Sequence, residues 1–408
     1  MAGSTPEAST ATVAEGQVQG KHTFAFIAMT CLFFFWGFIT VLNDILIPFL
    51  KESFDLNYTQ AMLVQFCFFG AYFIVSPFAG RLIDKVGYQQ GIVIGLLTTA
   101  AGCCLFYPSA SLHLYPLFLF GFFVLASGIT ILQVAANPYV AALGPEKTAA
   151  SRLNLAQAAN SFGTTVGPIV GAALILGVVA ADASAVQGPY LMIAALLVVA
   201  AIVFRSIKLP VLTHMESEEK AEGSVWEHRH LVLGALAIFL YVGGEVSIGS
   251  FLVNYFSESS IGGLTTAEAG EMVAYYWGAA MIGRLIGAVL MNYVADTKYL
   301  AINAVIAIVM IVVSMNTSGS LAMWSILAVG FFNSIMFPTI FTLAVKGLGS
   351  MTSKGSGFVC QAIVGGALIP LVQGVAADTM GIQLSFIVPM LCYIYIGWYA
   401  LNGAERKA

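Results

Sequence analysis

The chain has 408 residues, of which 59% are hydrophobic and only 9% are charged. A soluble protein of this length needs far more charged side chains to cover its surface, so the composition excludes an ordinary soluble domain. The formal net charge is −4, and the basic residues are scattered along the chain rather than clustered, so no surface for a nucleic acid is expected.

The lysines and arginines lie almost entirely on one side of the apolar segments. If these segments cross a bilayer in alternation, 14 of the 16 basic residues fall on one side, Lys51 falls on the other, and Arg284 falls inside a segment. Because cytoplasmic loops collect Lys and Arg, the basic side is predicted to be cytoplasmic and to carry both termini. The chain is therefore predicted to be a multi-pass membrane protein.

Residues 1–22 contain no apolar run typical of a secretory signal and are predicted to be a disordered cytoplasmic N-terminus. Twelve apolar spans follow, each of roughly 20 residues or more and long enough to cross ~30 Å of hydrocarbon. Their predicted limits are 23–50, 58–84, 88–108, 112–143, 149–178, 187–206, 229–257, 268–296, 298–316, 320–346, 354–378 and 383–402.

The polar stretch 207–228 is predicted to be a cytoplasmic linker between two six-helix bundles, 23–206 and 229–403, and residues 404–408 a cytoplasmic tail. Gly-Phe-Phe occurs at Gly121 and again at Gly330, and a Gln-Ala pair precedes a proline at Gln157 and at Gln361. The predicted fold is therefore all-α, with twelve transmembrane helices in two pseudo-symmetric bundles. Transporters that move two bundles around a midplane site have this architecture.

Three ionisable residues stand out because they lie well inside the predicted spans, where a charge costs about 2.5–3.5 kcal/mol near the bilayer centre. Asp44 lies in the first span, Glu245 in the seventh and Arg284 in the eighth. An apolar surrounding favours the neutral form of a carboxylic acid, so Asp44 and Glu245 are candidates to bind a proton on one side and release it on the other. The alternatives are a helix-end role for Asp44 and a static ion pair between Glu245 and Arg284, whose predicted depths differ by ~6 Å.

Uncharged amides are concentrated in the fourth and fifth spans, at Gln133, Asn137, Gln157 and Asn160. An amide offers hydrogen-bond donors and an acceptor without a fixed charge, which suits a polyol substrate. The alternative is that these amides bind neighbouring helices to one another. Further candidate ligands are Asn43, Gln65, Asn333 and Gln361, with Trp36 and Trp277 as stacking faces for a sugar ring.

The turn after the second span reads Gly80-Arg-Leu-Ile-Asp84-Lys85-Val-Gly87-Tyr-Gln-Gln. It resembles the signature G-x-L-x-D-[RK]-x-G-[RK]-[RK] of the major facilitator superfamily, with glutamines at the last two positions. Glycines permit a tight turn and close helix approach, and the aspartate can pair with a neighbouring helix end. We expect these residues, together with Arg152, to form a conformational latch.

Several motifs resemble the fucose/galactose/glucose symporter branch of that superfamily, and most of all its bacterial glucose/galactose transporters. They are Leu-Asn-Asp44-Ile-Leu-Ile-Pro, Ala-Ala-Asn137-Pro-Tyr-Val, Leu-Gly144-Pro-Glu and Arg152-Leu-Asn-Leu-Ala-Gln157 with Asn160-Ser-Phe-Gly163. The resemblance implies import of a monosaccharide with protons, by alternating access, through the inner (cytoplasmic) membrane. It implies a proton-coupling role for Asp44. The family's glutamate before Ala-Ala-Asn-Pro is Gln133 here, which cannot titrate.

We hypothesise that Glu245 takes the second proton-coupling role, while coupling by Asp44 alone or by sodium stays open. The rival function is a proton-coupled drug or metabolite exporter of the same superfamily. Its support is Gly163-Thr-Thr-Val-Gly167-Pro168-Ile-Val-Gly171, which resembles the antiporter signature G-x-x-x-G-P-x-x-G. The central amides argue against the apolar pocket that such an exporter needs.

No nucleophile–base pair, phosphate loop or metal-ligand spacing is present in the sequence, so neither an enzyme nor a metal or organic cofactor is expected. The expected partners are a sugar and the lipid bilayer. No obligatory protein partner is expected, and a monomer is compatible with the sequence.

Overall fold

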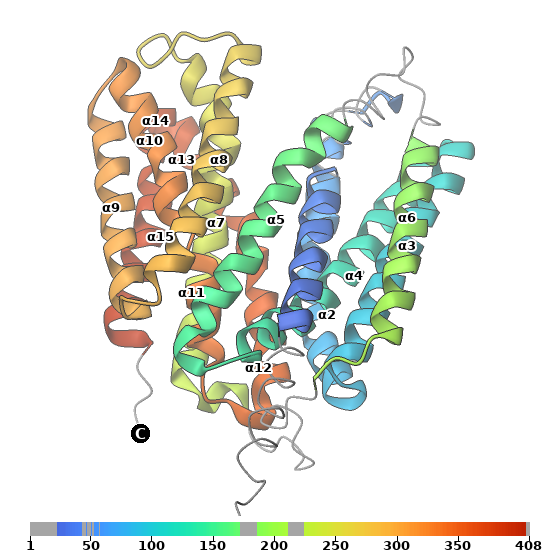
Figure 1. Ribbon diagram of the computed structural model, residues 1–408. Coiled ribbons are helices and arrows are strands. Elements are labelled where there is room, and N and C mark those ends of the chain that lie inside the picture. Colours follow the sequence, from blue (N-terminus) through green and yellow to red (C-terminus); the bar gives the residue numbers. More distant parts are fainter. Residues whose placement is uncertain are drawn as a thin grey trace, which may run out of the picture.

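The computed structural model describes residues 23–42, 46, 50, 53–56, 58–171, 186–210 and 224–404. The secondary structure within these ranges is entirely helical, and the helices stand in two groups (Figure 1). Eleven helical segments of the described chain are long and apolar enough to cross a membrane. The helix α5 (Ala149–Gly171) adds a twelfth segment, in agreement with the predicted number.

The first half contains six helices that follow the predicted spans closely. They are the helix Thr23–Leu42, α2 (Tyr58–Val86), α3 (Tyr88–Ser111), α4 (Tyr115–Ala142), α5 and α6 (Gln187–Ser206). The predicted first and fifth spans continue to residues 50 and 178. Of these continuations, residues 43–45, 47–49 and 172–178 lie outside the described residues.

The second half begins with α7 (Arg229–Ser257), α8 (Thr266–Leu290) and α9 (Asp296–Asn316). Its last three spans are interrupted, whereas each was predicted as one continuous helix. The span 320–346 is α10 (Gly319–Asn333) and α11 (Met336–Val345), and the span 354–378 is α12 (Thr352–Gln361), a 3₁₀ turn and α13 (Gly365–Met380). The last span consists of α14 (Ile382–Ser385), α15 (Ile387–Trp398) and a π-helical end at Tyr399–Gly403.

The break between α10 and α11 has a local cause. Pro338 has no N–H and cannot bond the carbonyl oxygen of Ser334 four residues earlier, so the helix loses one hydrogen bond there. Ser334 and Ile335 form a turn instead of helix. The consequence is a backbone acceptor that is free to bind a side chain from another helix.

The first and fifth spans of each half pack through glycine in the same way. A Cβ at Gly163 on α5 would overlap the carbonyl oxygen of Phe34, and a Cβ at Gly365 on α13 would overlap that of Phe239 on α7. Small residues allow helix backbones to approach this closely inside a membrane. The shared contact supports a related arrangement of the two halves.

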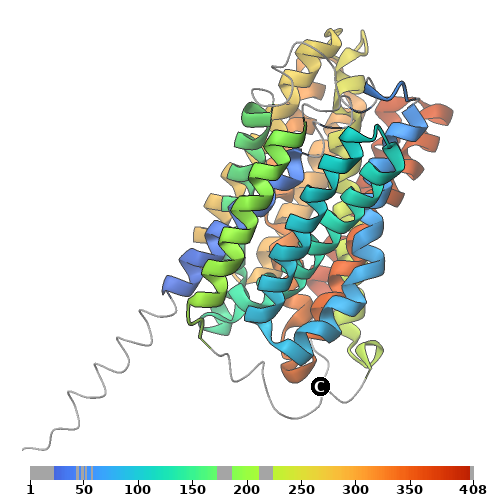
Figure 2. The same cartoon turned by 90° about the vertical axis from the view of Figure 1, so that its right-hand side faces the viewer.

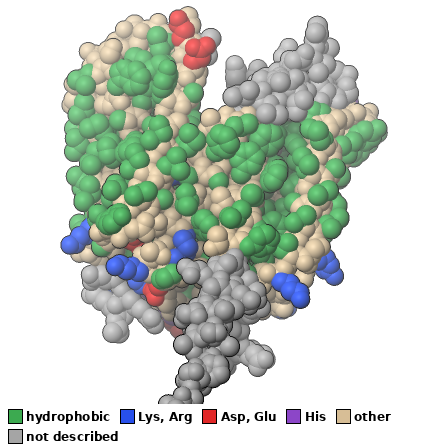
Figure 3. All heavy atoms as spheres, in the orientation of Figure 1, with side chains coloured by type: hydrophobic (Ala, Val, Ile, Leu, Met, Phe, Trp, Pro, Cys, Tyr) green, Lys and Arg blue, Asp and Glu red, His purple; other side chains and the backbone are tan. Residues whose placement is uncertain are grey.

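The two halves meet at one end and separate toward the other (Figures 1 and 3). Lys and Arg side chains gather at the end where the halves meet, which we call the basic end (Figure 3). Turned by 90°, the helices of both halves run along one common direction (Figure 2).

At the basic end, α2 of the first half crosses α12 of the second at very short range. A Cβ at Gly80 would lie 2.8 Å from the carbonyl oxygen of Ser353, and a Cβ at Gly357 would lie 2.7 Å from that of Ser76. The hydroxyl of Tyr88 lies 3.0 Å from Ser353 Oγ, and Ser356 Oγ donates to the Val134 carbonyl at 3.0 Å. Closure of this end therefore depends on residues without side-chain bulk.

We expect Gly80→Val to open the basic end, because its side chain would collide with the backbone of α12. Spin labels on Arg205→Cys and Lys298→Cys, one in each half, should move apart in distance measurements made without the native cysteines. Gly70→Val is the matched control, since nothing lies within 4 Å of a Cβ at that position of α2. Unchanged distances in Gly80→Val would contradict the expectation.

Candidate functional site

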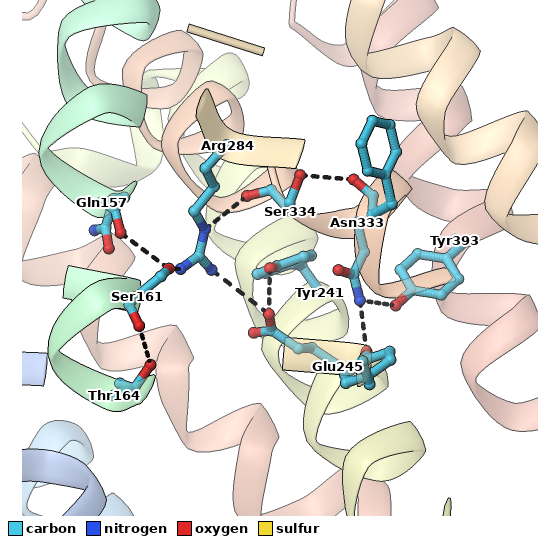
Figure 4. Close-up of polar contacts among 11 residues, drawn as sticks. Gln157, Ser161, Thr164, Tyr241, Glu245, Arg284, Asn333, Ser334 and Tyr393 are labelled. Carbon is cyan, nitrogen blue, oxygen red and sulfur yellow. Dashed lines mark hydrogen bonds and ion pairs between the residues drawn. The ribbon is translucent and has the colours of Figure 1, made fainter. Parts of the chain in front are cut away.

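A buried ion pair lies within the second half. Arg284 Nη2 on α8 lies 3.8 Å from Glu245 Oε1 on α7, and the two side chains are only 12% and 13% exposed. The Tyr241 hydroxyl donates to the same carboxylate oxygen at 2.8 Å (Figure 4). The two intramembrane charges that the sequence singled out in this half therefore meet.

The broken helix holds the arginine in place. Arg284 Nε donates to the free carbonyl oxygen of Ser334 at 3.1 Å. A Cβ at Gly283 would overlap the Phe331 carbonyl, and a Cβ at Gly287 would lie 2.9 Å from Asn154 Nδ2. Glycines before and after the arginine thus let α8 approach both the broken helix and α5 of the other half.

Arg284 also contacts the first half. Its Nη1 donates to Ser161 Oγ on α5, and Asn154 Nδ2 on the same helix donates to the Arg284 carbonyl at 2.8 Å. Figure 4 shows the guanidinium between Ser161 on one side and Glu245 on the other. The three functional groups around this arginine come from both halves of the molecule.

Two of the four amides predicted in the fourth and fifth spans bind neighbouring helices. Gln133 Nε2 donates to the Tyr72 hydroxyl at 2.6 Å, and Asn160 Nδ2 donates to the Phe33 carbonyl at 3.0 Å. The geometry of these two donors therefore agrees with the alternative interpretation, in which the amides hold neighbouring helices together.

The other two amides keep hydrogen-bonding capacity. Both polar atoms of the Asn137 side chain are buried without a partner. The Gln157 residue is 6% exposed, and among the described residues only its backbone carbonyl takes part in a hydrogen bond outside the helix ladder, with Ser161. Buried polar atoms without partners are uncommon and invite a ligand or water.

The amide nitrogens of Asn333 and Gln361 in the second half donate to protein groups, whereas Asn333 Oδ1 is buried without a partner. Asn333 Nδ2 donates to the hydroxyls of Tyr276 at 2.7 Å and of Tyr393 at 3.0 Å. Gln361 Nε2 donates to the Phe73 carbonyl of the first half at 3.1 Å, so it joins the halves.

The two candidate stacking residues differ in exposure. Trp36 is only 7% exposed and its ring centroid lies 5.1 Å from that of Phe33, so it is packed in the first half. Trp277 is 39% exposed and lies beside Gly249 of α7. Of the two, Trp277 has more ring surface open to a ligand.

The predicted latch residues occupy two places. Gly80 and Asp84 face α12, where Asp84 lies against Ser353 and Lys354, and Gly87 has φ = 80°, a value that glycine adopts without strain. Lys85 is exposed in the last turn of α2. Arg152 instead binds carbonyls at the end of α4, including that of Val140 at 3.4 Å, and so ties α4 to α5 within one half.

Asn43 and Asp44 lie outside the described residues, and so does the side chain of Gln65. The residues that sequence reasoning missed are Ser161, Tyr241 and Ser334. A proline four residues after Ser334 was the available signal for its free carbonyl. A serine within a helix carries no comparable signal.

A cavity of about 520 Å³ lies between the halves at the basic end. Glu146 of the first half and Lys346 of the second line it and form an ion pair of 3.3 Å, with side chains 67% and 59% exposed. Because this pair is solvated, it contributes little to stability.

The model of the family described as Major Facilitator Superfamily matches residues 25–367. The chain belongs to the major facilitator superfamily. It is 56% identical over 398 residues to the glucose/galactose transporter of Brucella abortus, covering 96% of this chain and 97% of the relative. It is 34% identical to the L-fucose-proton symporter of Escherichia coli, covering 93% of each.

A crystal structure of a Major Facilitator Superfamily transporter, FucP, in the outward conformation matches with a TM-score of 0.88 at 33% identity, covering 95% of this chain and 100% of that one. The predicted all-α fold of twelve helices in two bundles is thereby confirmed, as is the resemblance to this branch of the superfamily.

Arg284→Gln is expected to destabilise the protein by about 3 kcal/mol, because it leaves the Glu245 carboxylate buried without its cation. Thermal unfolding in detergent measures the effect. The double variant Glu245→Gln/Arg284→Gln should recover most of the loss. Lys346→Gln, which breaks the exposed pair, should cost at most ~1 kcal/mol. Equal losses in the two single variants would be evidence against a buried pair.

Proposed function

We propose that this protein imports a hexose of the glucose/galactose type together with protons, by alternating access. The observation that carries the proposal is the 56% identity to the Brucella glucose/galactose transporter over nearly the whole of both chains. The proton as coupling ion is supported by the more distant similarity to the fucose-proton symporter.

The proposal places the protein in the inner (cytoplasmic) membrane with the basic end and both termini on the cytoplasmic side. The distribution of Lys and Arg supports this orientation. In the state described, the halves are then in contact on the cytoplasmic side and separated on the other, as an outward-facing carrier requires.

The hexose is proposed to bind between the halves. Asn137 and Gln157 are the best-supported ligands, since both polar atoms of the Asn137 amide lack a partner and no hydrogen bond joins the Gln157 amide to the described residues. The remaining proposed ligands are Asn43, Gln65, Gln133, Asn160, Asn333 and Gln361, with Trp277 as a stacking face and Trp36 in a packing role. Neutral amides bind hydroxyls without the desolvation cost of a charge.

Proton coupling is proposed to use Asp44 of the first half and Glu245 of the second. Gln133 cannot bind and release a proton, so a second carboxylate must come from elsewhere, and Glu245 is buried beside the interface of the halves. A symporter needs the proton and the sugar to bias the same two-state equilibrium.

Export of a drug or metabolite is less well supported. The glycines of the antiporter-like sequence in α5 have a packing role, because Gly163 meets the Phe34 carbonyl and a Cβ at Gly167 would overlap Val41. The motif therefore needs no export function to explain it.

We expect purified protein in proteoliposomes to catalyse counterflow of glucose and galactose in preference to other hexoses, to fucose and to N-acetylated sugars. Accumulation should follow an imposed pH gradient and should not change when sodium is replaced by potassium. Sodium-dependent uptake at constant pH would exclude proton coupling, and efflux of apolar compounds without sugar counterflow would favour the exporter.

Glu245→Gln is expected to lower sugar accumulation driven by a pH gradient at least tenfold while counterflow, which needs no net proton movement, persists. Asp44→Asn should behave in the same way. Glu271→Gln, which changes an exposed carboxylate on α8, is the control and should transport normally. Normal accumulation in Glu245→Gln would remove this residue from the coupling scheme.

A further inference from the structure

The guanidinium group of Arg284 contacts side chains of both halves. Nη2 faces Glu245 within the second half, whereas Nη1 donates to Ser161 Oγ on α5 of the first half (Figure 4). We infer that Ser161 is the positioning residue through which the first half senses the charge of Glu245, with Arg284 as the connecting group. This inference rests on the proposed function only in assigning the coupling proton to Glu245.

The hydroxyl of Ser161 is arranged to accept from Arg284. It donates its single proton to the Gln157 carbonyl at 3.1 Å, which leaves the oxygen lone pairs for the guanidinium. Ser161 is 4% exposed, so water has little access to this bond. Gln157 and Asn160, two of the proposed sugar ligands, lie on the same stretch of α5.

Among the described side chains, three hydrogen bonds join α5 to α8, and they differ in kind. Ser151 Oγ donates to the Ala288 carbonyl at 2.5 Å, and Asn154 Nδ2 donates to the Arg284 carbonyl at 2.8 Å. Both are bonds to neutral backbone. The Ser161 contact involves a charged group, and it lies ten residues, or ~15 Å, beyond Ser151 in the direction away from the basic end. Of the three, this contact is the one whose strength depends on the charge at Glu245.

The direction of the effect follows from burial. With Glu245 ionised, the guanidinium has a counter-charge inside the closed interface. Protonation of Glu245 removes that charge, and a buried guanidinium without one is costly, so separation of α5 from α8 becomes more favourable because it admits water. Within the described chain, the other titratable groups facing Glu245 are the phenols Tyr241, Tyr276 and Tyr393, which are neutral at physiological pH and cannot replace the lost charge.

Protonation therefore biases the molecule toward opening at the basic end. Symport needs a bias in this direction. A proton taken up at the end opposite the basic end then favours opening of the basic end, where the proton and the sugar are released. Ser161 transmits this bias to the first half, because its hydroxyl is the first-half group that the Arg284 guanidinium binds.

A double-mutant cycle between Ser161→Ala and Glu245→Gln tests the inference. The readout is the ratio of open to closed populations at the basic end, from distances between labels on Arg205→Cys and Lys298→Cys in full-length protein without sugar. Glu245→Gln alone should raise this ratio roughly fivefold or more. In the presence of Ser161→Ala the same substitution should change it less than about twofold.

Two matched variants separate a specific role from general weakening of the interface. Ser151→Ala removes a hydroxyl bond between the same helices, so the effect of Glu245→Gln should persist in its presence. Ser161→Thr keeps the hydroxyl and should restore the full effect. Ser161→Gly serves as a second deletion of the hydroxyl if Ser161→Ala does not fold.

Additive effects of Ser161→Ala and Glu245→Gln would overturn the inference, as would loss of the Glu245→Gln effect in Ser151→Ala. The cycle requires neither sugar nor transport. A failure to transport hexoses therefore tests the proposed function alone, and an additive cycle in a protein that transports hexoses rejects the role of Ser161 alone.

Discussion

A guanidinium buried in a membrane protein needs acceptors for its N–H groups and an opposite charge, and few places in an apolar bundle supply both. Glu245 supplies the opposite charge for Arg284, the Ser334 carbonyl is a backbone acceptor, and the Ser161 hydroxyl is a side-chain acceptor. Each partner depends on a separate feature: a carboxylate on α7, a helix broken ahead of Pro338, and the approach of α5. The relative positions of four helices are therefore tied to one side chain.

The closed end is built on the opposite principle. At the crossing of α2 and α12 there is almost no side chain between the backbones, because Gly80 and Gly357 lie where a Cβ would collide with the opposite helix. The glycines at this crossing are uncharged, and the charged groups at this end, Asp84 facing Lys354 and the ion pair between Glu146 and Lys346, have exposed carboxylates. Small differences in free energy can therefore separate the halves, as a carrier that alternates between two states requires.

The amides of the first half divide between two tasks. Gln133 and Asn160 donate to other helices of their own half, whereas both polar atoms of Asn137 lack a partner and the Gln157 amide makes no hydrogen bond to the described residues. The division explains why composition and depth were insufficient to identify ligands: an amide at the right height is equally able to bind a neighbouring helix. The Gln133 amide, which cannot titrate, donates to the Tyr72 hydroxyl and so links α4 to α2.

The sequence by itself determined the membrane class, the twelve spans and their division into two halves, because burying charge in hydrocarbon is so costly that charges report topology directly. It also singled out Glu245 and Arg284 and brought them to similar depth. Only the tertiary structure decided that the last spans are broken, and that Arg284 also binds Ser161, 123 residues away in the other half. Such partners depend on how closely particular helices approach. The distance between these helices depends on glycines that allow close approach and on the Ser334 carbonyl that binds Arg284. The hydrophobic periodicity of a single helix does not predict it.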